Sequence, residues 1–138
     1  MILLDTSGLL AALDESQRHH QAAANSVRDH EPRLLSPFVL AELDYLLATR
    51  VGRRAALALL AEVARGAYRL EPFSEVDVAA ALSFLEYYAD LDLGLADASL
   101  LVLATRHSCL DILTLDERHF RAVRGPAGKA FHILPADA

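Results

Sequence analysis

The chain has 138 residues, of which 54% are hydrophobic and 23% are charged. These values fit a single folded domain over residues 1–138 and exclude a disordered chain. No apolar run reaches the ~18 residues of a membrane span, and residues 1–5 lack the basic start of a signal peptide. The one cysteine, Cys109, has no partner for an internal disulfide, so we expect a cytoplasmic protein with a structural thiol.

The charge balance argues against one common class of partner. The formal net charge is −6, which disfavours binding of nucleic acid through a broadly basic surface. The objection weakens if acidic side chains hold metal ions, since two divalent cations bring the total from −6 to −2. Of the 13 basic residues only Lys129 is a lysine, and arginine is suited to two-point contacts with phosphate.

The first half of the chain is predicted to alternate short strands with longer helices. Ser36 followed by Pro37 is a typical helix start, because serine caps free amides and proline fits the first turn. Gly52 and Gly66 end the two helices that follow. The expected elements are a strand over 1–5, helices over 6–13 and 16–29, a strand over 34–36, and helices over 37–50 and 53–65.

The second half repeats this alternation. Ser74 and Asp77 have the spacing of a capping box and start a helix that runs to about Tyr88. Further elements are a strand over 68–70, a loop over 90–94, a buried helix over 96–107, and strands over 111–114 and 131–133. Strands that alternate with helices predict an α/β sandwich with a mostly parallel sheet. In such sheets ligands bind at the carboxyl ends of the strands.

Two acidic residues occupy those strand ends. Asp5 directly follows the first strand, and Asp116 lies two residues beyond Thr114. We expect both side chains to lie at the ligand-binding edge of the sheet. Each also has a simpler interpretation, because Asp5 suits a helix cap and Asp116 suits an ordinary turn.

Two further acids lie on helices among apolar neighbours. Glu42 is in the middle of its helix, and an acid on an apolar face is costly to bury without a partner. Asp44 has equally apolar neighbours, so periodicity alone does not choose between the two. Asp97 lies in the first turn of its helix, where the helix dipole favours an anion. Capping explains Asp97 as well as ligand binding does, and a hydrogen-bonded surface acid would explain Glu42.

Clustered carboxylates favour a particular kind of ligand. Their ionised forms repel one another and need compensation, and hard oxygen ligands suit Mg²⁺ or Mn²⁺. Such a site can activate water and stabilise a phosphate under attack.

Four motifs in order along the whole chain resemble those of PIN-domain proteins, specifically VapC toxins. They are Asp5-Thr6-Ser7, Glu42 within residues 37–43, Asp97 within 95–100 and Asp116 within 113–120. The resemblance implies a three-layer sandwich in which Asp5, Glu42, Asp97 and Asp116 surround one or two Mg²⁺ or Mn²⁺ ions. It favours Glu42 over Asp44, and it implies secondary roles for Thr6 or Ser7 and for Asp92.

The same resemblance implies an activity and partners. VapC toxins are ribonucleases that cut RNA, often tRNA or ribosomal RNA, form homodimers and are inhibited by a VapB antitoxin. In that scheme Asp5 and Asp97 are the most direct metal ligands, while Glu42 and Asp116 complete the shell or orient water. The apolar helices around residues 9–13 and 39–47 are expected to leave a groove for a partner, unless core or dimer contacts cover them.

Two basic clusters are candidates for contact with the RNA backbone. The first comprises Arg50, Arg53 and Arg54, for which an ordinary solvated surface is the favoured interpretation. The second lies just past Asp116 and comprises Arg118, Arg121, Arg124 and Lys129. His119 follows Asp116 by three residues, and a structural role is favoured over contact with substrate.

Rival functions lack residues that their chemistry requires. A haloacid-dehalogenase-like phosphatase needs a second acid at the position of Ser7, and a receiver domain needs a lysine placed differently from Lys129. Serine hydrolases and P-loop NTPases are excluded because their motifs are absent. A catalytically silent PIN-like module that binds RNA or protein remains the alternative, which metal-dependent cleavage would distinguish.

Overall fold

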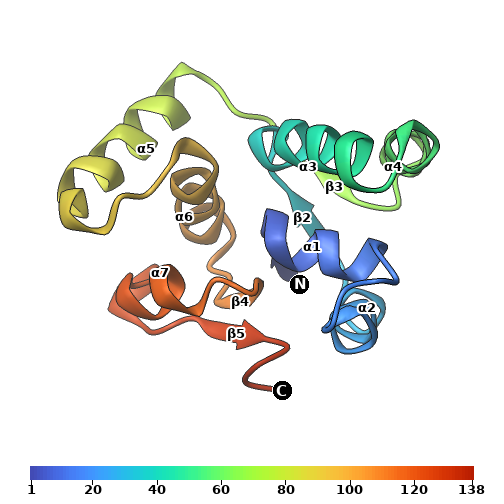
Figure 1. The fold of residues 1–138 in the computed structure, drawn as a ribbon. Helices are drawn as coiled ribbons and strands as arrows, with labels where there is room; N and C mark the ends of the chain where they lie inside the picture. Colours follow the sequence, from blue (N-terminus) through green and yellow to red (C-terminus); the bar gives the residue numbers. More distant parts are fainter.

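The computed structural model describes all residues from 1 to 138 and has a central five-stranded sheet (Figure 1). The strands lie in the order β3-β2-β1-β4-β5, and every neighbouring pair is parallel. Their bounds are β1 Ile2–Leu4, β2 Arg33–Leu35, β3 Arg69–Leu70, β4 Asp111–Leu113 and β5 His132–Leu134. The mostly parallel α/β sandwich predicted from the sequence is therefore confirmed.

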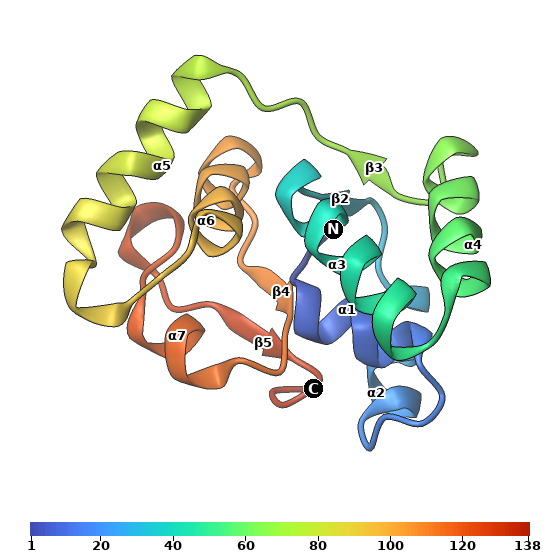
Figure 2. The same cartoon turned by 45° about the horizontal axis from the view of Figure 1, so that its top comes forward.

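Helices cover both faces of this sheet. α1 to α4 lie to one side and α5 to α7 to the other (Figures 1 and 2). Their bounds are α1 Thr6–Leu13, α2 His20–Arg28, α3 Pro37–Arg50, α4 Arg53–Ala64, α5 Glu75–Tyr87, α6 Leu95–His107 and α7 Glu117–Ala122. No helix combines the length and the hydropathy that crossing a bilayer requires.

Burial on both faces explains the apolar character of the strands. Ile2, Leu3 and Leu4 of the central strand β1 have no exposed surface. Residues 98–104 of α6 are all buried, which confirms the prediction of a buried helix. Cys109 is a buried free thiol just before β4, as predicted.

One predicted helix starts too early and one helix was missed, each for a clear physical reason. The helix expected over 16–29 begins only at His20, because the carboxylate of Asp14 accepts hydrogen bonds from the amide and hydroxyl of Ser16 and forms a turn. The short helix α7 was not predicted, because six residues hardly show a period. Other boundaries, such as those of β2, β3 and β5, shift by one residue.

Candidate active site

Asp5 lies at the carboxyl end of the central strand, where β1 gives way to α1. Parallel pairing sets Leu4 opposite Leu113, and the Asp5 amide donates to the Leu113 carbonyl at 3.0 Å. The next residue, Thr114, donates its hydroxyl to Asp5 Oδ2 at 2.6 Å. Asp5 occupies the N-cap position of α1, but its side chain makes no capping hydrogen bond to the helix, so capping does not account for the direction of its carboxylate.

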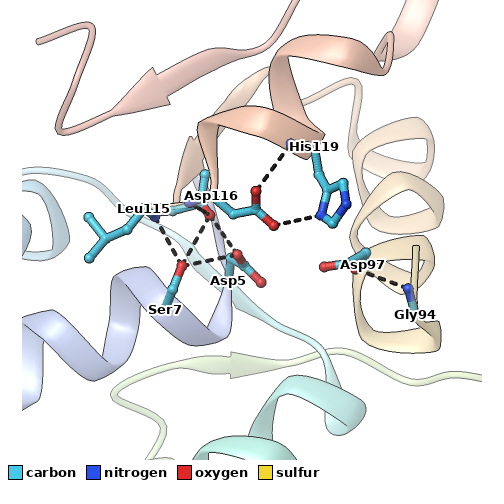
Figure 3. Close-up of polar contacts among 8 residues, drawn as sticks. Asp5, Ser7, Gly94, Asp97, Leu115, Asp116 and His119 are labelled. Carbon is cyan, nitrogen blue, oxygen red and sulfur yellow. Dashed lines mark hydrogen bonds and ion pairs between the residues drawn. The ribbon is translucent and has the colours of Figure 1, made fainter. Parts of the chain in front are cut away.

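Hydroxyl groups connect Asp5 to the segment that carries Asp116 (Figure 3). The Asp116 amide donates to the Thr114 hydroxyl at 2.9 Å, and the Leu115 amide donates to the Ser7 hydroxyl at 3.0 Å. Ser7 Oγ also lies 3.4 Å from Asp5 Oδ2. Thr114 was missed as a site residue, although its place beside Asp5 follows from the strand register.

Gly8 allows α1 to approach β4 closely enough for these contacts. A Cβ atom at this position would lie 2.5 Å from the Leu113 carbonyl oxygen, far inside van der Waals contact. That carbonyl is the one that accepts the Asp5 amide. The missing side chain of Gly8 thus sets the distance between the first acid and the end of β4.

Asp97 serves as a cap and also reaches the site. Its Oδ2 accepts the Gly94 amide at 3.0 Å at the start of α6, which confirms the capping interpretation. The side chain also approaches the other acids. Its pKa is raised mainly by burial and further by the negative charges of Asp116 and Glu42. The hydrogen bond from the Gly94 amide and the charge of His119 act in the opposite direction and lower this pKa.

Asp116 is fixed by His119, three residues further on. Asp116 Oδ1 accepts the His119 amide at 3.1 Å, which caps α7, and Oδ2 lies 2.7 Å from His119 Nδ1. The imidazole ring lies between Asp116 and Asp97 (Figure 3). A structural role for His119 was favoured from the sequence, and in the structure His119 orients the carboxylate of Asp116.

Glu42 is placed by the packing of α3 against α6. Ser36 caps α3 by accepting the Phe38 amide at 3.2 Å, and its hydroxyl lies 2.7 Å from that of buried Ser99 in α6. Glu42 is exposed rather than buried on an apolar face, so the argument from burial was wrong. It nevertheless borders the same cavity as the other acids, and Asp44 does not.

All four predicted acids border one cavity of about 290 Å³. Its walls come from the start of α1, from α3 and α6, and from the segment between β4 and α7, so segments far apart in sequence meet there. The lining residues are Asp5, Thr6, Ser7, Leu10, Glu42, Leu46, Arg50, Asp97 and Asp116. We call this cavity the acidic pocket.

Asp5, Glu42 and Asp97 form no ion pair within the chain, and the only ion-pair partner of Asp116 is His119. Burial raises the pKa of Asp5 from 3.8 to about 6, and nearby Asp97 and Asp116 add to the rise. The hydrogen bond from Thr114 opposes it by favouring the carboxylate. The ionised carboxylate of Asp5 is unfavourable in these surroundings, so a bound cation would stabilise it strongly.

The donor set fits a hydrated divalent ion. No three His, Cys, Asp or Glu side chains lie close enough together to hold an ion directly. Mg²⁺ needs no such cage, because it keeps several waters and takes one or two carboxylates. The buried hydroxyl of Thr6, in the pocket wall, has no hydrogen-bond partner and would bind such a water.

The structure does not bring every candidate to the acidic pocket. Asp92 is exposed and follows the 3₁₀ helix Ala89–Leu91 in a left-handed conformation, and Arg118 is exposed on α7; neither lines the pocket. Arg121 is paired with Glu117 and Asp137. Arg50, for which a solvated surface was favoured, does line the pocket.

Comparison with known proteins connects this geometry with a family. A family model described as PIN domain matches residues 2–126. Ribonuclease VapC26 of Mycobacterium tuberculosis is 42% identical over 135 residues, which is 97% of this chain and all of that protein.

Solved structures agree on the fold. The crystal structure of Mycobacterium tuberculosis VapC20, described as a Sarcin-Ricin loop cleaving toxin, has a TM-score of 0.78 at 23% identity over 85% of this chain and 91% of that one. VapBC2 from Rickettsia felis, bound to a promoter DNA fragment, has a TM-score of 0.65 at 17% identity over 96% of this chain and 98% of its own. With the match over residues 2–126 and the close sequence relative, this chain belongs to the PIN-domain family, in its VapC branch.

Proposed function

We propose that this protein is a metal-dependent endoribonuclease toxin that hydrolyses RNA phosphodiester bonds. The observation that carries the proposal is the meeting of Asp5, Glu42, Asp97 and Asp116 in one pocket. The named activity of the relative VapC26, a ribonuclease, supports the reaction class. RNA as substrate agrees with action in the cytoplasm.

The residues divide the work by position. Asp5 and Asp97, the two carboxylates whose pKa values burial raises, bind Mg²⁺ or Mn²⁺ most directly. When bound, the ion supplies an activated water at neutral pH and offsets charge on the phosphate. Glu42 and Asp116 orient a water molecule, and the hydroxyl of Thr6 forms a hydrogen bond with that water. Thr114 holds Asp5 in the ionised form that binding needs.

Cleavage of RNA by the purified protein in Mg²⁺, in Mn²⁺ and in EDTA tests the proposal. Asp97→Asn and Glu42→Gln should each lower cleavage at least 100-fold, because an uncharged amide binds the ion poorly. Asp44→Asn is the matched control on the same helix and should cleave like wild type. Cleavage that persists in EDTA, or in Asp97→Asn, would refute the metal mechanism. RNA binding without cleavage would favour the silent module instead.

The antitoxin is proposed to bind beside α3. A cavity of about 140 Å³ lies between α1, α3 and α4 and is lined by Leu13, Leu47, Ala55, Ala58, Leu59 and Glu62. Since Leu47 of this cavity adjoins Leu46, which lines the acidic pocket on the same helix, a VapB-type segment held there would lie next to the acids. Ala58→Glu, at an exposed position, should weaken inhibition by the antitoxin and leave cleavage intact. Unchanged inhibition would exclude this groove.

The homodimer is proposed to form through α5. This helix exposes large apolar side chains, and an apolar cavity of about 800 Å³ lies between it and α6. The exposed residues are Val76, Val78, Leu82 and Tyr87. The charged residues that line this cavity, Asp77 and Arg106, pair with each other, and the apolar surface around them suits a protein interface better than chemistry. Light scattering should give a dimer for wild type and a monomer for Leu82→Glu.

Structured RNA, either tRNA or ribosomal RNA, is the proposed substrate. VapC20, which shares the fold, is described as cleaving the Sarcin-Ricin loop. Sequencing of RNA ends after expression of the toxin identifies the cut site. Cuts scattered over messenger RNA would contradict this substrate class.

A further inference from the structure

A single stripe of α3 links the acidic pocket to a positive charge. Glu42, Leu46 and Arg50 are spaced four residues apart, so they lie on one face of the helix, and all three line the pocket. Eight residues of helix cover ~12 Å. Arg50 therefore stands two turns away from the acid, at the far end of the same cavity.

The side chain of Arg50 has no partner within the chain. It makes no hydrogen bond and no ion pair, whereas Arg33, Arg106 and Arg121 each have both. Arg50 is also the only positively charged residue that lines the acidic pocket. No carboxylate of the pocket comes within ion-pair distance of it, so its charge remains available to a ligand.

The positive charge of Arg50 would reduce the electrostatic repulsion between the acidic pocket and RNA. Four carboxylates with one divalent ion leave the pocket negative, which repels the phosphates of RNA. A guanidinium at the rim offsets part of that repulsion and presents a planar fork to two phosphate oxygens. Helix-dipole stabilisation also favours arginine in a last turn, but it does not require a side chain that faces the pocket.

We propose that Arg50 binds a backbone phosphate of the substrate next to the phosphate being cleaved, and so fixes the register of the RNA along α3. The inference rests on the proposed ribonuclease activity. The ligand group is a phosphodiester with two free oxygens, and no base is read. Arg50 is thus a substrate-binding residue, while the four acids carry the chemistry.

The test compares Arg50→Gln and Arg50→Lys with Arg65→Gln. Arg65 is a matched control because it is exposed, unpaired and at the C-terminal end of α4, away from the pocket. Cleavage of a short oligoribonucleotide is measured in Mg²⁺ over a range of salt. Arg50→Gln should raise KM about tenfold with little change in kcat. The slope of log kcat/KM against log salt is negative, and in Arg50→Gln it should become shallower by about 0.7 because one phosphate contact is lost. Arg50→Lys should partly restore KM.

A second measurement separates this inference from the proposed activity. Affinity for the same oligoribonucleotide is measured by fluorescence anisotropy in an Asp97→Asn background, where cleavage does not interfere. Weaker binding by Arg50→Gln than by Arg65→Gln supports the role of Arg50 even if the wild-type protein cleaves no RNA. Equal KM, salt slope and affinity in the two variants would overturn it, whether or not Mg²⁺-dependent cleavage is found. Loss of antitoxin binding alone in Arg50→Gln would overturn it too.

Discussion

The carboxylate of Asp5 accepts a 2.6 Å hydrogen bond from the hydroxyl of Thr114, which lies 109 residues further along the chain. Thr114→Val keeps the shape of the side chain but removes this donor and the acceptor for the Asp116 amide. Partners that orient metal ligands typically contribute 10–100-fold to affinity or activity. We therefore expect a loss of about that size in apparent Mg²⁺ affinity, measured as the Mg²⁺ concentration for half-maximal cleavage.

Thr114→Ser is the control for this prediction, because it retains the hydroxyl and loses only a methyl group. It should require nearly the wild-type concentration of Mg²⁺. If Thr114→Val and Thr114→Ser behave alike, the hydroxyl does not position Asp5.

The stability of the metal-free protein should depend on the ionisation of Asp5. Its pKa rises from 3.8 to about 6 on folding, so ionisation is less favourable in the folded state. The free energy of unfolding contributed by Asp5 therefore falls as the pH rises from about 4 to about 6 and stays low above that. The loss is about 3 kcal/mol at pH 8. Asp5→Asn removes it and should be more stable than wild type there.

Urea unfolding in EDTA at pH 4 and pH 8 measures this difference. The two proteins should converge at pH 4, and Mg²⁺ should stabilise only the wild type. Asp90→Asn, at an exposed site outside the pocket, is the control and should follow wild type at both pH values. An Asp5→Asn variant that is less stable than wild type at pH 8 would contradict the expected sign.

His119 should contribute to activity through Asp116. His119→Ala removes the 2.7 Å contact with Asp116 Oδ2 but leaves the backbone amide that holds Oδ1. The carboxylate then gains freedom to rotate, and we expect about tenfold slower cleavage with little change in the thermal midpoint. His119→Asn, which offers a shorter donor, should recover part of the rate, and exposed His19→Ala should have no effect. Full activity in His119→Ala would show that capping alone orients Asp116.

Gly8 should tolerate no side chain. In Gly8→Ala the new methyl group meets the Leu113 carbonyl at 2.5 Å, and overpacking of this kind costs about 1–3 kcal/mol. Because the same carbonyl accepts the Asp5 amide, cleavage should fall further than stability explains. Gly94→Ala, whose nearest contact is an ordinary 3.9 Å, is the comparison. Differential scanning calorimetry measures the loss of stability in the two variants, and cleavage assays measure the loss of activity.

The sequence predicted the parts of the fold whose signals are local. The helix over residues 37–50 has a cap, an N-terminal proline and a glycine after its end, and the structure gives the same bounds. The continuous apolar run before Asp5 predicted a strand, and all three residues of β1 are buried. Asp5 and Asp116 were located by the general rule that parallel sheets bind ligands at strand ends.

What the sequence did not show depends on contacts between distant segments. Glu42 and Asp44 have equally apolar neighbours, and only the packing of α3 against α6 decides which one faces the pocket. Thr114 has no motif of its own, and Arg50 belongs to a cluster that looks like ordinary surface. The turn at Asp14 was missed because a side chain competes there with the backbone of a helix.

The central place of β1 in the sheet has a consequence for synthesis of the protein. Its neighbour on one side, β4, begins only at Asp111, so a ribosome must release most of the chain before the sheet can close. Asp5 and Glu42 leave the ribosome early, but the acidic pocket forms only after Asp97 and Asp116 have followed. An incomplete product that stops before β4 has three of the four acids but lacks Asp116 and the strand beside β1, so its acidic pocket is not formed.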